Sequence, residues 1–182
     1  MKRVALTFIG KDRPGIVAKI SQALYGSGCN IEDATMTILE GEFAMILIAL
    51  LPNPSVEKKL KKAYGLLKNR WGLYNFWKIL PARKRLIKKH PARTKAFLIS
   101  VIGKDRTGIV YETSRILARM RLNITDLNSK LSGITAQPLF AMMLEVDTPM
   151  RFNSQKLDSA FKALSRKMGV DVKIRPLEQL SL

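Results

Sequence analysis

The residues whose types and spacing best suit chemistry lie in a nine-residue phrase that occurs twice. The sequence reads IGKDRPGIV from Ile9 to Val17 and IGKDRTGIV from Ile102 to Val110, and only Pro14 has changed, to Thr107. Each phrase follows an apolar run and precedes a helical pattern, which predicts a turn into the start of a helix. The first amides of a helix have no intrahelical partner and carry the positive end of the helix dipole, so they suit a carboxylate.

The same residues also fit a purely structural turn. Gly10 and Gly15 can bend the backbone and allow close approach. Pro14 suits the first helical position, and Thr107 could cap the second helix with its hydroxyl. Turn chemistry alone therefore leaves two interpretations open, an anion site or a tight turn with a cap.

No other group of residues has the pattern of a catalytic or metal site. His90 is the only histidine and lies among lysines, so we expect it to be solvated. Cys29 is the only cysteine, and we interpret it as a small apolar residue packed inside. The sequence has no Cys/His cluster with metal-ligand spacing. We therefore expect a protein that is not an enzyme and uses no metal or cofactor.

The apolar runs indicate a cytoplasmic protein without membrane contact. The longest run, Phe43 to Leu51, is far shorter than the roughly 20 residues that a membrane helix needs. The apolar run at the N-terminus is interrupted too early for a signal peptide. A single cysteine, which cannot form a disulfide within the chain, agrees with a reducing compartment.

The positive charge of the chain is concentrated in one segment. The formal net charge is +18, and +8 of it comes from residues 78–95, which contain no acidic side chain. Pro81 and Pro91 lie in this stretch, so we predict a basic linker over residues 81–94. The linker is either a solvated tether or a contact for nucleic acid or an acidic partner. The candidates for such a contact are Arg83, Lys84, Arg85, Lys88 and Lys89.

The repeat extends well beyond the phrase. Asn30-Ile31-Glu32-Asp33 returns as Asn123-Ile124-Thr125-Asp126, and Phe43-Ala44-Met45 returns as Phe140-Ala141-Met142. The second copy has extra residues between these points, around Ser132 to Pro138, which indicates a turn between two strands. We predict a duplicated domain, with one unit over residues 1–80 and the other over residues 95–178.

Each copy predicts the element order βαββαβ. The expected strands cover residues 4–9, 30–39, 42–51 and 73–79 in the first copy, and 96–102, 123–133, 139–146 and 170–175 in the second. Helical patterns follow the first and third strands of each copy. The predicted fold class is α+β, with two ferredoxin-like units of antiparallel sheet and helices on one face. Because the strand sequences barely alternate, both sheet faces should be dry, and we predict association between units or chains.

The stretch GKDRPGIVAKISQALYGSGCNIEDATM resembles the ACT domain, a small ligand-binding regulatory module of this element order. The family signature is a D-R-P-G-I turn followed by N-I at the start of the second strand. Both copies carry it, with Thr107 in place of the proline. The tandem arrangement with GCNIED is similar to the glycine cleavage system transcriptional repressor family, which consists of two ACT units without an attached enzyme or DNA-binding domain.

The resemblance implies that units pair side by side into an eight-stranded sheet and bind amino acids at the seam. The turn of one unit and the second strand of its partner would contact the ligand. Carried over to this sequence, the binding residues are Asp12, Arg13, Pro14, Gly15, Ile16, Asn30 and Ile31, and Asp105, Arg106, Thr107, Gly108, Ile109, Asn123 and Ile124. Turn amides would take the ligand carboxylate, and an asparagine would hold the ammonium, with help from an aspartate. The alternative is that Asn30 and Asn123 only begin strands.

From the resemblance we expect a non-enzymatic regulator that binds a small amino acid, with glycine as the suggested candidate. Its partner would be a transcription regulator or a metabolic enzyme, and the protein would be a homodimer. Two alternatives are a nucleic-acid-binding protein that uses the basic linker and an ACT adaptor without a ligand. Because Thr107 restores an N–H that Pro14 lacks, the two ligand sites need not be equivalent.

Overall fold

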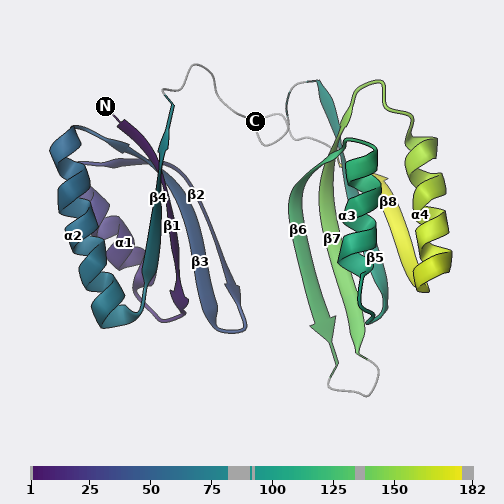
Figure 1. The fold of residues 1–182 in the computed structure, drawn as a ribbon, viewed down its shortest axis with the longest axis horizontal. Helices are drawn as coiled ribbons and strands as arrows, with labels where there is room; N and C mark the ends of the chain where they lie inside the picture. The colour runs from purple at the N-terminus through teal and green to yellow at the C-terminus, as the bar shows by residue number, and fades with distance from the viewer. Residues whose placement is uncertain (1, 82–90, 92, 134–137, 178–182) are drawn as a thin grey trace. The chain divides into compact units, whose positions relative to one another are not determined.

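The computed structural model describes residues 2–81, 91, 93–133 and 138–177, and the chain divides into two compact units, residues 1–85 and 86–182 (Figure 1). Unit 1 consists of β1 (Lys2–Lys11), α1 (Ile16–Tyr25), β2 (Asn30–Leu39), β3 (Glu42–Leu51), α2 (Pro54–Trp71) and β4 (Tyr74–Leu80). Unit 2 consists of β5 (Thr94–Lys104), α3 (Ile109–Arg119), β6 (Asn123–Ser132), β7 (Leu139–Pro149), α4 (Ser154–Met168) and β8 (Val170–Pro176). The predicted α+β class and the βαββαβ order are confirmed in both units.

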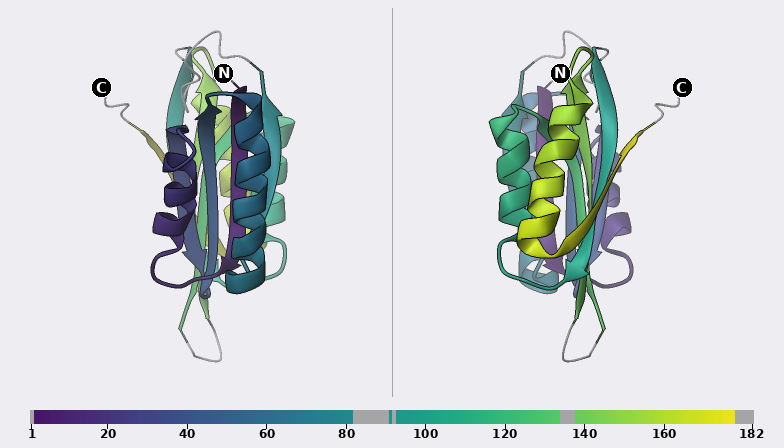
Figure 2. Two further views of the ribbon diagram at one scale, coloured as in Figure 1. Left: turned by 90° about the vertical axis from the view of Figure 1, so that its left-hand side faces the viewer. Right: turned by 90° about the vertical axis from the view of Figure 1, so that its right-hand side faces the viewer.

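Each unit is one antiparallel sheet with two helices on one face. The strand order is β2-β3-β1-β4 in unit 1 and β6-β7-β5-β8 in unit 2, so β2, β4, β6 and β8 are edge strands. Figure 2 shows α1 and α2 over the sheet of unit 1 in one view, and α3 and α4 over the sheet of unit 2 in the other. The other face of each sheet receives no helix from its own unit.

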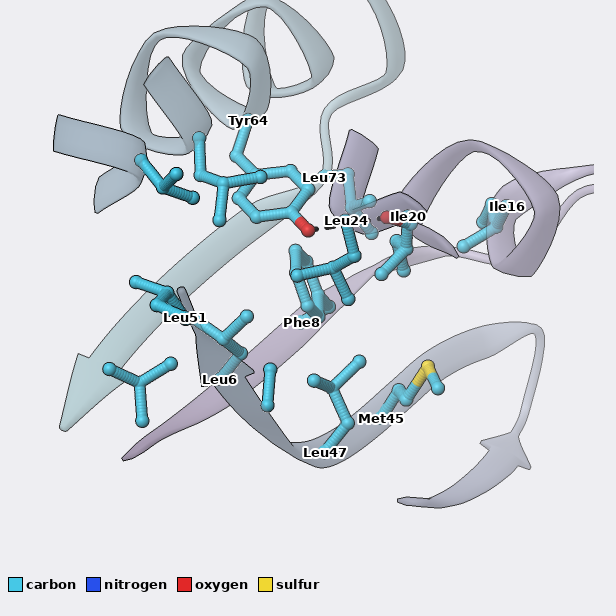
Figure 3. Packing of buried hydrophobic residues seen from close by; sticks show 14 of the residues in the cluster. Leu6, Phe8, Ile16, Ile20, Leu24, Met45, Leu47, Leu51, Tyr64 and Leu73 are labelled. Carbon is cyan, nitrogen blue, oxygen red and sulfur yellow. Dashed lines mark hydrogen bonds between the residues drawn. The ribbon is translucent and has the colours of Figure 1, made fainter. Parts of the chain in front are cut away.

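The core of unit 1 lies between its two helices and the side chains of the sheet that face them (Figure 3). The ring of Tyr64 from α2 meets the ring of Phe8 edge to face, with centroids 4.9 Å apart. The Tyr64 hydroxyl donates a hydrogen bond of 3.2 Å to the carbonyl of Ile20, which joins the two helices over the sheet. Burial raises the pKa of the Tyr64 phenol, so this hydroxyl stays a donor. Unit 2 has an equivalent core around Ile99 and Phe161.

The face of the unit 1 sheet away from the helices is apolar and open in the described residues. Ile9, Ile46 and Phe76 occupy this face, and they are 45%, 45% and 63% exposed. The weak alternation of the strand sequences therefore reflects a second apolar face. What covers this face stays a prediction, because association is not tested by the structure of a single chain. Within the described residues, no helix has the length and hydrophobicity to cross a bilayer.

Two glycines of unit 1 test how closely β1 packs against the end of α2. At Gly10, a β-carbon would lie 2.8 Å from the carbonyl oxygen of Gly72, whereas at Gly65, on α2, it would meet nothing within 4 Å. We expect Gly10→Ala to destabilise unit 1 by roughly 1–3 kcal/mol, because backbone must move. We expect Gly65→Ala to stabilise it by about 0.5–1 kcal/mol, because alanine favours the helix.

Urea unfolding followed by tryptophan fluorescence measures both effects. The only two tryptophans, Trp71 and Trp77, lie in unit 1, so the signal reports this unit. Equal midpoints for Gly10→Ala and the wild type would contradict the close packing of β1 against the end of α2.

Candidate functional site

The turn between β1 and α1 ends in a left-handed glycine that starts the helix. Gly15 is the N-cap residue, with φ 91°, and Gly108 has the same role in unit 2, with φ 99°. The prediction that Pro14 takes the first helical position is therefore wrong, because the helix begins two residues later, at Ile16. The prediction that Thr107 caps the second helix is wrong for the same reason, since a residue before the N-cap does not reach the first-turn amides.

The start of each helix keeps unpaired amides. In the part of the chain that the structure describes, no side chain caps α1 or α3. The first backbone bonds run from the N–H of Lys19 to the carbonyl of Gly15, at 2.9 Å, and from Glu112 to Gly108, at 2.8 Å. The amides before Lys19 and Glu112 in these first turns have no intrahelical acceptor. We call these two places mouth 1, residues 12–18, and mouth 2, residues 105–111.

The aspartate of each turn joins the mouth to the neighbouring hairpin. The N–H of Asp12 donates to the carbonyl of Gly41 at 2.7 Å, and the N–H of Asp105 donates to Pro138 at 3.1 Å. These two amides are therefore used within the unit, whereas both carboxylates lie at the exposed surface. The turn is held in place by its own backbone.

The arginine of each turn rests on the end of the second helix of its unit. The guanidinium of Arg13 lies over the ring of Trp71, 5.7 Å from its centroid. The Nη1 atom of Arg106 lies 3.9 Å from the position that a β-carbon on Gly169 would take. A helix C-terminus favours a cation, so both arginines stabilise the turn. Trp71 lies beside mouth 1 but was not among the predicted site residues. The sequence pattern indicated only that Trp71 lies on the buried face of its helix.

The second half of the predicted site lies at the other end of the sheet. Lys11 pairs with Glu42 at the mouth end, whereas Asn30 pairs with Leu50, eight residues further along β3. This separates mouth 1 from the start of β2 by roughly 26 Å at about 3.3 Å per residue. In unit 2, Asn123 pairs with Asp147 at the end of the sheet away from mouth 2. A single unit therefore does not bring the two halves of the predicted site together.

The repeated N-I-x-D motif encodes a strand start with a bulge. The pairing register shifts between Ile31 and Asp33, and again between Ile124 and Asp126, so the intervening residue is the extra one. In unit 1 this residue is Glu32, and its carboxylate accepts a bond of 2.7 Å from Arg3. The bulge was not predicted, although the motif was the signal for it. Asn30, Ile31 and Asn123 are exposed, and Ile124 packs against the core of unit 2.

The two mouths differ in the charge on the first turn of the helix. The first turn of α1 carries no acidic residue, whereas α3 carries Glu112 at the position of Lys19. Lys167 and Arg115 donate hydrogen bonds to Glu112 and lower the pKa of its carboxyl. A carboxylate of the protein thus already lies near the positive end of α3, and mouth 1 is the better place for a ligand carboxylate.

Two other predicted features have a plain outcome. Cys29 is partly buried and packs against the core of unit 1, and burial raises the pKa of its thiol. The linker candidates Arg83, Lys84, Arg85, Lys88 and Lys89 lie outside the described residues.

The family profile of the ACT domain matches this chain twice, over residues 2–74 and 95–175. These two ranges contain both mouths and both N-I-x-D motifs. They cover most of the chain and leave out the region around the predicted linker.

Among curated proteins, a UPF0237 protein of Neisseria meningitidis serogroup A is 38% identical over 79 residues, 43% of this chain and 83% of the relative. A UPF0237 protein of Methanocaldococcus jannaschii is 43% identical over 68 residues, 35% of this chain and 76% of the relative. The glycine cleavage system transcriptional repressor of Escherichia coli is 23% identical over 168 residues, 91% of this chain and 85% of the relative. The last match spans both units.

Two solved structures have a similar fold over nearly the full length of this chain. A protein of unknown function from Galdieria sulphuraria has a TM-score of 0.78 and 25% identity, over 97% of this chain and 99% of that chain. A putative glycine cleavage system transcriptional repressor has a TM-score of 0.69 and 18% identity, over 98% of both chains. The second likeness shows the fold alone.

The charge at mouth 2 gives a direct test by titration. We expect the carboxyl of Glu112 to titrate below the ordinary glutamate pKa of about 4.3, because its two cationic partners stabilise the ionised form. A depressed folded pKa stabilises unit 2 above the unfolded pKa, and this contribution is lost as the pH falls through the folded pKa. NMR titration of the side-chain carboxyl measures the midpoint. Lys167→Ala should raise it, whereas Lys162→Ala, on the same helix, should not. An ordinary midpoint in the wild type would contradict the described hydrogen bonds.

Proposed function

This chain belongs to the ACT domain family, and from that premise we propose that it is a non-enzymatic regulatory protein that binds a small amino acid. Glycine is the first candidate, because the relative that spans both units is a repressor of the glycine cleavage system. The proposed output is the regulation of transcription or metabolism through a partner protein. The observation that carries the proposal is the family match over both turns, together with helix starts that no described side chain caps.

The proposed ligand chemistry follows from mouth 1. The carboxylate of the amino acid accepts hydrogen bonds from the amides at the start of α1, where the first turn has no competing acid. Pro14 contributes no N–H, so the amides of Gly15, Ile16 and Val17 are the donors we propose. The Asp12 carboxylate, which is exposed beside them, balances the ligand ammonium. Mouth 2 has the same backbone with Glu112 nearby, and we propose that it binds the ligand more weakly.

A second unit must complete each site. Mouth 1 lies at one end of the sheet and Asn30 at the other, so both halves of a site meet only if two edge strands lie antiparallel. In that arrangement the N-I start of the partner strand reaches the mouth. The edge strands β2 and β6 have unpaired backbone groups on one side, which allows a continuous sheet across the seam. We propose that the asparagine at this start, Asn30 or Asn123, binds the ligand ammonium.

Such a composite site couples binding to assembly. A ligand that contacts two units stabilises the paired arrangement over any arrangement in which the units are apart, and only this difference in affinity can transmit a signal. A site contained in one unit would bind without changing the pairing. When the amino acid is bound, the proposed regulator therefore presents the surface of the paired units to its partner protein.

A calorimetric and fluorescence screen of the twenty amino acids tests the proposal. The Trp71 ring lies against Gly15 and Arg13, so binding at mouth 1 should change its fluorescence in a Trp77→Phe background. We expect Gly15→Ala to weaken this binding roughly tenfold, because alanine disfavours the left-handed backbone at φ 91°. Gly108→Ala is the matched control, since it introduces the same strain in unit 2 and should leave the Trp71 signal intact.

Asparagine variants then identify the partner unit. Loss of the Trp71 signal with Asn123→Ala places a unit 2 strand at mouth 1, and loss with Asn30→Ala places a second copy of unit 1 there. Binding that survives both substitutions and Gly15→Ala contradicts the proposed site. No binding of any amino acid contradicts the proposed function.

A further inference from the structure

One edge of unit 1 combines cations with exposed aromatic rings. We call it the lysine–aromatic edge, and it consists of Lys61 and Lys68 on α2 and Tyr74, Phe76 and Lys78 on β4. The ammonium of Lys68 lies 5.2 Å from the centroid of the Tyr74 ring. The ammonium of Lys61 lies 5.6 Å from the centroid of Trp77, the inward-facing neighbour of Phe76. Tyr74 is 52% exposed and Phe76 is 63% exposed.

The two exposed rings form a short row on the open face of the sheet. Tyr74 pairs with Ile9, and Phe76 pairs with Thr7, so both residues occupy strand positions on the face of the sheet away from the helices. Residues two apart on one strand are separated by roughly 6.6 Å, which is about twice the thickness of an aromatic ring and leaves room for a flat group beside each ring. Lys78 follows at the next position of the same face.

The second unit shows that the fold does not require this edge. The buried positions match across the units, with Leu60 and Leu157 in one pair and Tyr64 and Phe161 in another. Of the five edge positions, only that of Lys78 keeps its charge in unit 2, as Arg175, and the other four differ. The residues of unit 2 at the places of Lys61, Lys68, Tyr74 and Phe76 are Asp158, Ser165, Asp171 and Lys173. Unit 2 therefore adopts the same fold without the two rings and with two acidic residues, Asp158 and Asp171, at edge positions.

In the described residues, the lysines of α2 are only partly paired within unit 1: Lys59 donates a hydrogen bond of 2.9 Å to the carbonyl of Gly26, and Lys61 pairs with Glu57. Lys58, Lys59, Lys61 and Lys62 all lie in the first half of the helix, where the helix dipole disfavours cations. Lys58 and Lys62 are also one turn apart, a spacing at which like charges repel. Within the described residues, the only acid on α2 is Glu57, and it is already bound to Lys2 and Lys61. An anion from outside the unit would offset this repulsion.

We propose that the lysine–aromatic edge binds single-stranded nucleic acid. Bases stack on Tyr74 and Phe76, and the phosphates lie along Lys61, Lys68 and Lys78. Flat exposed rings with cations on the adjacent helix and strand suit a nucleic-acid strand whose base faces are open. A duplex hides those faces, so the rings would contribute nothing. Lys61 keeps free donors for a phosphate, because its ammonium has three and its carboxylate partner Glu57 takes one. This inference does not depend on amino acid binding.

Fluorescence anisotropy of the full chain with labelled 12-nucleotide dT and rU strands tests the proposal. We expect Tyr74→Ser/Phe76→Ser to weaken binding roughly fivefold or more for each ring that stacks a base, with an unchanged salt slope. We expect Lys61→Ser/Lys68→Ser to reduce the slope of log affinity against log salt by about 1.4, because each phosphate contact to a single strand contributes about 0.7. The two strands show whether RNA or DNA binds better.

A matched pair of variants controls for general charge. Lys162→Ser/Arg166→Ser removes two exposed cations from α4 of unit 2, and we expect it to leave the affinity within about twofold. An equal loss from the two double variants overturns the proposal, since the attraction would then be unspecific. The unfolding midpoint by tryptophan fluorescence should stay unchanged in the ring variant, because both rings are exposed.

Three further outcomes overturn the proposal. The first is normal binding by the ring variant together with complete loss when Arg83, Lys84, Arg85, Lys88 and Lys89 are changed to serine, which assigns binding to the linker segment. The second is equally tight binding of a duplex of the same length. The third is a wild-type dimer that the ring variant converts to a monomer in sedimentation, since the rings would then be covered by a second copy.

Discussion

In each unit, the mouth depends on the close approach of a strand glycine to the backbone at the end of the second helix, Gly10 to Gly72 in unit 1 and Gly103 to Gly169 in unit 2. A β-carbon at Gly10 would lie 2.8 Å from the Gly72 carbonyl oxygen, and at Gly103 a β-carbon would lie 3.1 Å from that of Gly169. Only glycine lets the end of the first strand pass so near the end of the second helix. The following turn then has its arginine against that helix end and its helix start exposed. The turn is therefore held by close backbone packing and by its arginine, and in the described residues no side chain caps the start of the helix.

The fold could be predicted well from the sequence, because the duplication shows the pattern of each element twice. The predicted strands at 30–39 and 42–51 agree with β2 and β3, and the apolar face of α1 is the buried one. The site was harder to predict, since its details depend on backbone geometry. The left-handed N-cap at Gly15 moved Pro14 outside the helix, and the bulge at Glu32 gave the N-I-x-D motif a local structural meaning. The distance between the mouth and Asn30 follows from strand register, which residue types alone do not give.

Comparison of the two units separates what the scaffold needs from what it tolerates. The left-handed glycine before the first helix and most buried helix positions recur in both units, so they belong to the fold. The first turn of the helix carries Lys19 in one unit and Glu112 in the other, and the last strand carries Tyr74 in one and Asp171 in the other. Both differences change the charge. The duplicated chain therefore has two copies of one framework, whose mouths and edges no longer present the same chemistry.

The open sheet face and the seam that we propose at β2 are different surfaces, which separates two kinds of association. A seam along β2 is made by backbone hydrogen bonds in the plane of the sheet, and it leaves Ile9 and Ile46 as exposed as before. Covering those side chains needs a partner above the face, where burial of apolar area is the driving force. The ligand that we propose at this seam would act on the first kind of association and not directly on the second. We therefore expect any association that covers the apolar face of unit 1 to be separate from ligand binding at the mouth.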